Sequence, residues 1–260
     1  MTILQAIILG IVEGITEFLP VSSTGHLILT SKLLGIADSN FLKSFEIAIQ
    51  FGAILSVVFL YWKKFIFNNE NWKKVLVAFL PAAIIGFLSY KILKKYLLAN
   101  ALLVVWSLVI GGIVLIVFEL WHKNCVQNLS DRRDSVLTYK QSFLVGLAQS
   151  LAIIPGVSRS GATIIGGLLM GINRQTIVEF SFLLAVPTMA AATGYDLLKS
   201  AGNFSFSEFH LLAIGFIVSF FVAMASIKWL LHFVKNHTFI FFGIYRIIAA
   251  LLFYFLVVRL

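Results

Sequence analysis

The amino-acid sequence predicts an all-α polytopic membrane protein with two inverted-topology repeats, each a re-entrant helix-loop-helix followed by three transmembrane helices. The first observation is composition: 60% of the 260 residues are apolar and 12% are charged, whereas soluble domains have about 45–50% and about 25%. The second is a series of long apolar runs. The third is a motif in the first half of the chain that recurs in the second half.

Six apolar runs are long enough to cross a bilayer, because an α-helix of about 20 residues spans the roughly 30 Å hydrocarbon core. The predicted spans are 44–62, 74–93, 100–121, 176–198, 208–232 and 238–258.

Four shorter runs form two pairs, 3–36 and 142–172, broken at Pro20 and Pro155. An arm of about 13 residues rises only about 20 Å and cannot cross the core. Each pair is therefore predicted to be re-entrant. Irregular backbone at membrane depth needs protein or a wet cavity to satisfy its polar groups, so the two tips are expected to line a site.

The two re-entrant pairs also resemble each other in sequence. Setting Gly10 on Gly146, a shift of 136 residues, places Glu13 on Gln149 and Gly25 on Gly161. Three spans follow each pair, and an odd number inserts the second copy upside down. The site of such an inverted repeat is expected near the interface of the two copies.

The predicted repeats are 1–121 and 142–260, joined by a cytoplasmic loop, 122–141. The net charge of +9 is spread over short polar gaps, which indicates a positive-inside bias rather than a nucleic-acid surface. The loops predicted to be cytoplasmic hold eleven Lys or Arg, against seven on the other side; they are 63–74, 122–141, 173–175 and 228–237. The first re-entrant pair would then enter from the outer leaflet.

Glu13 and Glu17 are four positions apart in a helical stretch, so their carboxylates share one face. Acids inside a bilayer are costly and indicate function. A divalent metal would relieve their repulsion, and Mg²⁺ favours one or two carboxylates plus phosphate oxygens. The alternative is a polar face that touches an aqueous vestibule.

Ser22, Ser23, Thr24 and His26 follow the first proline. Hydroxyls at a helix start are usually N-caps. The imidazole of His26 lies within one turn of Ser23 and could exchange protons with a hydroxyl or a leaving phosphate.

The second tip has an arginine and a glycine-serine loop at the start of a short helix, the place where amide groups and the helix dipole favour an anion. Arg159 can hold two phosphate oxygens with its planar fork, or it can form a structural ion pair with Glu13 or Glu17. The first copy thus has acids, base and hydroxyl, and the second has the cation, which predicts a composite site for a phosphorylated lipid. Weaker intramembrane polar candidates are Glu46, Gln50, Glu179 and Arg246, and a structural role is favoured for Arg246.

At these motifs the chain resembles the undecaprenyl-diphosphate phosphatase family, integral-membrane enzymes of bacteria also known as bacitracin-resistance proteins. The resemblance rests on Glu13-x-x-x-Glu17 leading into the segment 18–26, together with Pro155-Gly156-x-Ser158-Arg159-Ser160-Gly161-x-Thr163. The order, separation and overall length also fit, so it covers essentially the whole chain.

The resemblance implies hydrolysis of undecaprenyl diphosphate to the monophosphate and phosphate, which recycles the carrier lipid for peptidoglycan synthesis and confers bacitracin resistance. It also implies a divalent cation, Mg²⁺ with Ca²⁺ as the alternative, held by Glu13 and Glu17, and a site open to the outer side of the plasma membrane. The implied catalytic residues are Glu13, Glu17, Ser23, His26 and Arg159. The implied substrate-binding residues are Ser22, Thr24, Gly156, Ser158, Ser160, Gly161 and Thr163.

Two questions stay open at the level of sequence. Either Ser23 or a metal-activated water could attack the phosphorus. Inverted repeats with broken helices are also a carrier architecture, so a transporter or flippase of polyprenyl phosphate is the alternative function. The expected partners are the polyprenyl diphosphate and membrane lipids, without nucleic acid; the oligomeric state, including a homodimer, is left open.

Overall fold

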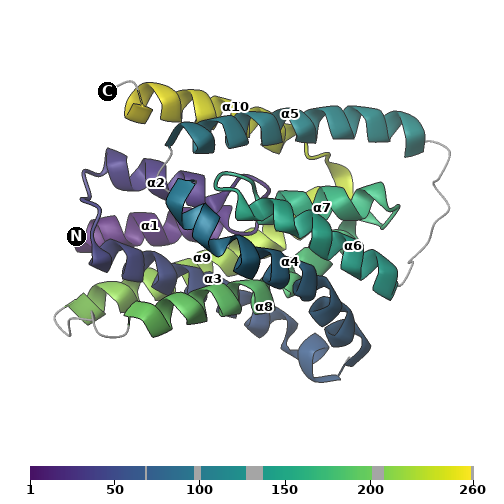
Figure 1. Ribbon diagram of the computed structural model, residues 1–260, viewed down its shortest axis with the longest axis horizontal. Helices are drawn as coiled ribbons and strands as arrows, with labels where there is room; N and C mark the ends of the chain where they lie inside the picture. Colours follow the sequence, from purple (N-terminus) through teal and green to yellow (C-terminus); the bar gives the residue numbers. More distant parts are fainter. Residues whose placement is uncertain (68, 97–100, 127–136, 201–207, 259–260) are drawn as a thin grey trace.

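The computed structural model describes residues 1–67, 69–96, 101–126, 137–200 and 208–258 (Figure 1). Within these ranges the chain is helical and contains no strand. The helices are α1 (Ile3–Thr16), α2 (Ser23–Leu33), α3 (Asn40–Phe67), α4 (Asn69–Tyr96), α5 (Ala101–Val126), α6 (Tyr139–Gln149), α7 (Arg159–Leu169), α8 (Arg174–Ser200), α9 (Phe209–Asn236) and α10 (Ile240–Phe253). A 3₁₀ turn, Ser150–Ile153, extends α6, and a π turn, Tyr254–Val258, extends α10.

The long helices confirm the prediction of an all-α membrane protein. Five of them, α3, α4, α5, α8 and α9, are long and apolar enough to span a bilayer. The sixth predicted span, 238–258, corresponds to the shorter apolar stretch Ile240–Leu256. The predicted loop 122–141 is shorter than expected, since α5 continues to Val126 and α6 already begins at Tyr139; its centre, 127–136, lies outside the described residues.

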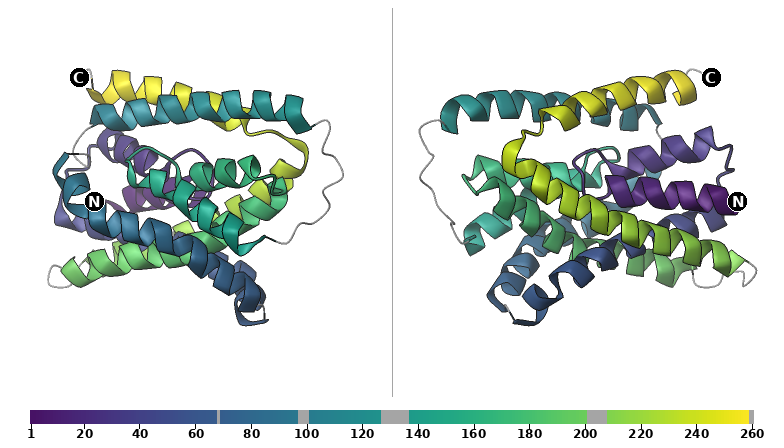
Figure 2. Two further views of the ribbon diagram at one scale, coloured as in Figure 1. Left: turned by 45° about the vertical axis from the view of Figure 1, so that its right-hand side comes forward. Right: turned by 180° about the vertical axis from the view of Figure 1, so that it is seen from behind.

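The helices are arranged in layers around the two pairs of short helices, α1/α2 and α6/α7, that the sequence predicts to be re-entrant. Helices α5 and α10 lie side by side in opposite directions along one edge of the molecule (Figures 1 and 2). The pairs α1/α2 and α6/α7 lie beneath them, and α3, α4, α8 and α9 cover the opposite side (Figure 2). The tips of both pairs are therefore enclosed by full-length helices.

Both re-entrant pairs are closed by the same contacts, which the sequence interpretation did not include. Helix α1 begins with a capping box between Thr2 and Gln5, and α6 begins with one between Thr138 and Gln141. The side-chain amide of Gln5 also donates to the carbonyl of Leu34 at 3.1 Å. Gln141 donates in the same way to the carbonyl of Met170 at 3.4 Å, and all these positions are related by the shift of 136 residues.

The packing of the helices also follows the proposed repeat. Helix α1 packs on α9 and, at the corresponding place, α6 packs on α4. A side-chain carbon at Gly10 would lie 2.8 Å from the carbonyl oxygen of Gly215, and one at Gly146 would overlap the carbonyl oxygen of Ala78. Both contacts therefore need a residue without a side chain. The opposite insertion of the two copies, and the division at 121 and 142, stay predictions.

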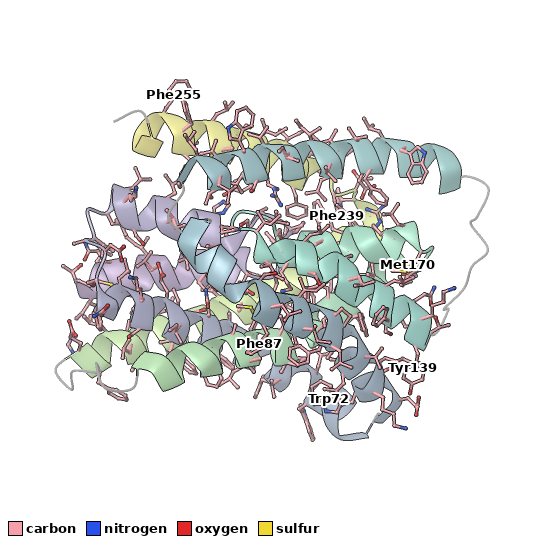
Figure 3. All side chains as sticks on the ribbon, viewed as in Figure 1. Trp72, Phe87, Tyr139, Met170, Phe239 and Phe255 are labelled. Carbon is pink, nitrogen blue, oxygen red and sulfur yellow. The ribbon has the colours of Figure 1, made fainter. Side chains whose placement is uncertain are left out.

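The outside of the molecule is apolar. Phe87 on α4 is 80% exposed and Phe255 at the end of α10 is 52% exposed, whereas Phe239 is buried between layers (Figure 3). Exposed large apolar side chains over most helices are expected where lipid rather than water is the solvent. The main core cluster lies between α3, α8 and α9 and extends to the re-entrant tips through Phe18 and Ile164.

A partly buried ion pair lies away from the tips. Arg174, at the start of α8, makes a two-pronged contact with Glu119 of α5, with one N–O distance of 2.9 Å. Glu119 also accepts the backbone N–H of Phe239 at 3.0 Å. This pair fixes the α5/α10 layer to α8 and satisfies both charges locally.

Candidate functional site

The two re-entrant tips reverse direction by different means. In the first tip, Ser22 adopts a positive φ of 72° immediately before α2. In the second tip, Gly156 adopts a φ of +90°, a conformation that glycine reaches without steric cost. A side-chain carbon at Gly156 would also lie 2.7 Å from the Cβ of Ser107. Glycine is therefore required here for both conformation and space.

A cavity of about 170 Å³ lies where the tips meet. It is lined by residues of both re-entrant pairs and by α3, α4 and α8: Glu17, Ser22, Ser23, Thr24, Gln50, Ala82, Gln149, Ala152, Val157, Ser158, Arg159, Thr188 and Met189. Glu17 and Ser23 of the first copy thus face the same space as Gln149 and Arg159 of the second copy.

Three side chains from the two copies are joined at the wall of this cavity. The hydroxyl of Ser23 donates to Oε2 of Glu17 at 2.6 Å. The other oxygen of Glu17, Oε1, accepts from Nη2 of Arg159 at 3.0 Å. The side chains of Arg159 and Glu17 are only 10% and 5% exposed, so this ion pair is screened little by solvent.

Arg159 is held in place by its second nitrogen and by an aromatic ring. Its Nη1 donates to the carbonyl of Ser181 on α8 at 2.8 Å, and its guanidinium carbon lies 5.8 Å from the ring centre of Phe18. Thr163 braces this contact, because its hydroxyl lies 2.6 Å from that of Ser181. The Nε of Arg159 is buried and has no hydrogen-bond partner among the described residues. The bonds to Ser181 and Glu17 use two of the five N–H donors of this arginine, so the guanidinium, which lines the cavity, keeps donors for a ligand.

Glu13 is completely buried, one turn before Glu17 on α1. Neither of its carboxylate oxygens has a hydrogen-bond partner in the described part of the chain. A buried carboxylate without a partner is costly, and a divalent cation would satisfy it. The donor set at Glu13 and Glu17 therefore fits the cation that the sequence predicts, although no cluster of three His, Cys, Asp or Glu side chains occurs among the described residues.

His26 is buried behind the first tip and does not face Ser23. Its Nδ1 lies 2.8 Å from the carbonyl oxygen of Ser22, which can only accept, so Nδ1 carries a proton. Its Nε2 lies 2.8 Å from the hydroxyl of Tyr245 on α10, and the two rings are stacked. The side chain in contact with the Ser23 hydroxyl is Glu17.

The remaining predicted residues of the second tip mostly stabilise it. Ser160 donates to the carbonyl of Leu19 at 2.8 Å, so its hydroxyl accepts the proton of Ser158 at 3.0 Å. This chain joins the two tips directly. The backbone N–H groups of Val157 and Gly161 already donate within the loop, to Ile154 and Ser158 respectively. These two amides are not free for an anion. In the first tip, Thr24 lines the cavity.

The structure adds a glutamine that was not among the predicted site residues. Gln149 lines the cavity, and its Nε2 donates to the hydroxyl of Thr188 at 3.1 Å. Thr188 itself donates to the carbonyl of Leu184, so the amide of Gln149 must present its nitrogen to Thr188. Its buried Oε1 is left without a partner among the described residues. The alignment of Gln149 with Glu13 was the available signal for it.

Comparison with known proteins agrees with these motifs. Residues 6–252 match the family described as Bacitracin resistance protein BacA. An undecaprenyl-diphosphatase of Aquifex aeolicus is 55% identical over 97% of this chain and 98% of its own length. Those of a Sulfurihydrogenibium species and of Persephonella marina are 55% and 51% identical, over 98% and 97% of this chain and 99% and 98% of their own lengths.

Proposed function

The chain belongs to the bacitracin resistance protein BacA family, and from this membership we propose that it is an undecaprenyl-diphosphatase. It hydrolyses undecaprenyl diphosphate to undecaprenyl phosphate and inorganic phosphate, as the names of its relatives indicate. Recycling of this carrier lipid supports peptidoglycan synthesis and bacitracin resistance. The observation that carries the proposal is the chain of contacts from Ser23 to Glu17 to Arg159 at the wall of a cavity lined by both tips.

In the proposed first step, the Ser23 oxygen attacks the terminal phosphorus of the diphosphate. Glu17 accepts the hydroxyl proton, because its Oε2 is already the hydrogen-bond partner of that hydroxyl. The bond between the terminal phosphorus and the bridging oxygen breaks, and undecaprenyl phosphate leaves. The oxygen of a water molecule then bonds to the phosphorus of the phosphoserine and the bond between phosphorus and the Ser23 oxygen breaks. The proton held by Glu17 returns to the Ser23 oxygen, and inorganic phosphate leaves with the hydrogens of the water.

Arg159 binds and orients the phosphoryl group. Its Nη1 and Nη2 hold Ser181 and Glu17, while its free Nε can donate to a phosphate oxygen. Positioning and charge stabilisation supply most of the catalysis in phosphoryl transfer. Gln149 presents an acceptor on another wall of the cavity, where it can bind the water of the second step.

Glu13 and Glu17 would hold a divalent cation, Mg²⁺ or alternatively Ca²⁺. When bound, the cation neutralises charge on the diphosphate oxygens and on the two carboxylates. The support for this assignment is the pair of buried, unpartnered oxygens of Glu13. Carboxylate oxygens are the ligands that these hard cations prefer.

We place the protein in the bacterial plasma membrane with its cavity open to the outer side. The larger number of basic residues in the loops 63–74, 122–141, 173–175 and 228–237 supports this orientation. The substrate is then bound from the outer leaflet, where its headgroup can reach the first re-entrant tip.

The decisive assay measures phosphate release from a polyprenyl diphosphate by purified protein, with Mg²⁺ and with a chelator. We expect release with Mg²⁺, and we expect Arg159→Ala to abolish nearly all of it while the protein still folds. Ser23→Ala should remove both turnover and a trapped phosphoserine detectable by mass spectrometry. Ser226→Ala is the matched control, since this buried serine of α9 donates to Val222 of its own helix and has no other hydrogen-bond partner among the described residues.

Two outcomes would contradict the proposal in different ways. Near-normal turnover by Ser23→Ala would exclude the serine nucleophile and favour attack by water. No release by the wild-type protein, with lipid binding intact, would favour the carrier function suggested by the repeat architecture.

A further inference from the structure

Arg246 is a buried cation that the proposed reaction does not use. Arg246 lies on α10 and is 2% exposed. None of the described carboxylates forms an ion pair with it. A charge in this position is costly unless several polar groups compensate for it. Its partners therefore indicate what it does.

Among the described residues Arg246 makes four hydrogen bonds, and all of them go to backbone carbonyl oxygens. Its Nε and Nη2 donate to Leu108 and Ser107 of α5, at 3.3 and 3.0 Å. Its Nη1 donates to the carbonyl of Pro20 at 3.3 Å, and Nη2 also donates to the carbonyl of Gly156 at 3.0 Å. One guanidinium thus links α10, α5 and the turns of both re-entrant pairs.

The two turn carbonyls occupy equivalent places in the two copies. Pro20 and Gly156 are separated by 136 residues, the shift that aligns the repeats. Pro20 lies three residues from Glu17 and from Ser23, and Gly156 lies three residues before Arg159. A displacement of either turn would therefore move one side of the Ser23–Glu17–Arg159 contact relative to the other.

We propose that Arg246 is a positioning residue, whose guanidinium fixes the two turns to each other and so sets the geometry of the cavity. It acts through backbone groups and touches no reacting atom. The planar fork is essential, because a lysine ammonium is a compact charge that cannot donate along several fixed directions at once. The space around the guanidinium is also limited, because a side-chain carbon at Gly111 of α5 would lie 2.6 Å from the guanidinium carbon.

The test compares Arg246→Lys with Arg174→Lys, which alters the partly buried arginine that pairs with Glu119 away from the tips. Both variants lose a guanidinium and keep a positive charge. Steady-state kinetics with polyprenyl diphosphate give kcat and KM, and hydrogen exchange by mass spectrometry gives the protection of the two tip segments, 17–26 and 154–163. The kinetic arm rests on the proposed phosphatase function, whereas the exchange arm does not.

For Arg246→Lys we expect kcat to fall by about 10²-fold, the scale of a displacement of about 1 Å in a reacting geometry, with KM changed by less than about threefold. Exchange should rise in both tip segments together, because one group holds both. Arg174→Lys should lower thermal stability and leave tip protection and kcat near the wild-type values.

A second variant keeps the proposal testable if Arg246→Lys does not fold. Gly111→Ala retains Arg246 but pushes its guanidinium aside, and it should also lower kcat and expose both tips to exchange. Gly194→Ala is its control, since a side-chain carbon there meets open space. Unchanged protection at the tips in Arg246→Lys or Gly111→Ala would refute the positioning role, and so would an equal effect of Arg174→Lys. Loss of activity in the wild-type protein itself would instead count against the proposed function.

Discussion

The substitution Glu17→Gln tests whether Glu17 accepts the proton of Ser23. The glutamine has the same shape but offers one acceptor oxygen and one NH₂ group. In the wild-type structure both oxygens of Glu17 accept, one from Ser23 and one from Arg159. Because Arg159 can only donate, the glutamine oxygen must face it, and the NH₂ group must face Ser23. The hydrogen bond between the two side chains is then reversed, because the glutamine NH₂ group donates to the Ser23 oxygen. The proton of the Ser23 hydroxyl therefore has no acceptor at residue 17.

The expected loss follows from this reversal. Removal of a general base costs about 10²–10⁴-fold in rate, so kcat should fall in that range. The fold should be retained, since the glutamine keeps the hydrogen bond to Arg159 and fills the same volume. Arg159→Ala, in contrast, leaves the Glu17 carboxylate buried without its partner, and loss of one member of a buried pair costs about 3–5 kcal/mol. Arg159→Ala should therefore be clearly less stable than Glu17→Gln.

A double-mutant cycle with Ser23→Ala measures whether the two residues act together. Phosphate release would be followed at saturating Mg²⁺, so that weaker cation binding does not enter the comparison. If Glu17 acts through Ser23, the double variant should be no slower than the slower single variant. Rate losses that multiply would show independent roles and refute the assignment. Glu70→Gln is the matched control, since this exposed carboxylate bonds to Lys73 and Tyr139.

Three further predictions concern Glu13, Gly146 and Tyr245. Glu13→Gln replaces a buried carboxyl group whose oxygens have no partner among the described residues. The midpoint of thermal unfolding in chelator should therefore rise, and its increase on adding Mg²⁺ should shrink. A lower midpoint in chelator would contradict this account. Gly146→Ala forces a methyl group against the carbonyl of Ala78 and should cost at least about 1–3 kcal/mol, seen as a lower midpoint with Gly194→Ala as control. Tyr245→Phe removes the hydroxyl that contacts Nε2 of His26. It should lower kcat by less than about tenfold, because a neutral hydrogen bond contributes about 1 kcal/mol. A loss of kcat as large as that of Glu17→Gln would show that His26 and Tyr245 take part in proton transfer.

Much of the architecture was predictable because it depends on local properties of the chain. Apolar runs of sufficient length predict membrane spans, and a proline between two short runs predicts a re-entrant tip. The internal alignment predicted that Glu17 and Arg159 belong to one site, and the structure brings them together at 3.0 Å. The capping boxes at Thr2 and Thr138 also follow from a local pattern, a threonine followed three residues later by a glutamine.

The sequence by itself determined the helical class, the places where the chain turns back between two short helices, and the residues that carry charge at those turns. Only the tertiary structure decided their partners. His26 contacts Tyr245, 219 residues away, instead of Ser23, and the structural role predicted for Arg246 is carried by hydrogen bonds to the carbonyls of Pro20 and Gly156. Hydropathy and residue spacing indicate how a single segment contacts the lipid or water around it. The partner of a buried polar group depends on which backbone or side-chain group another segment brings within about 3 Å.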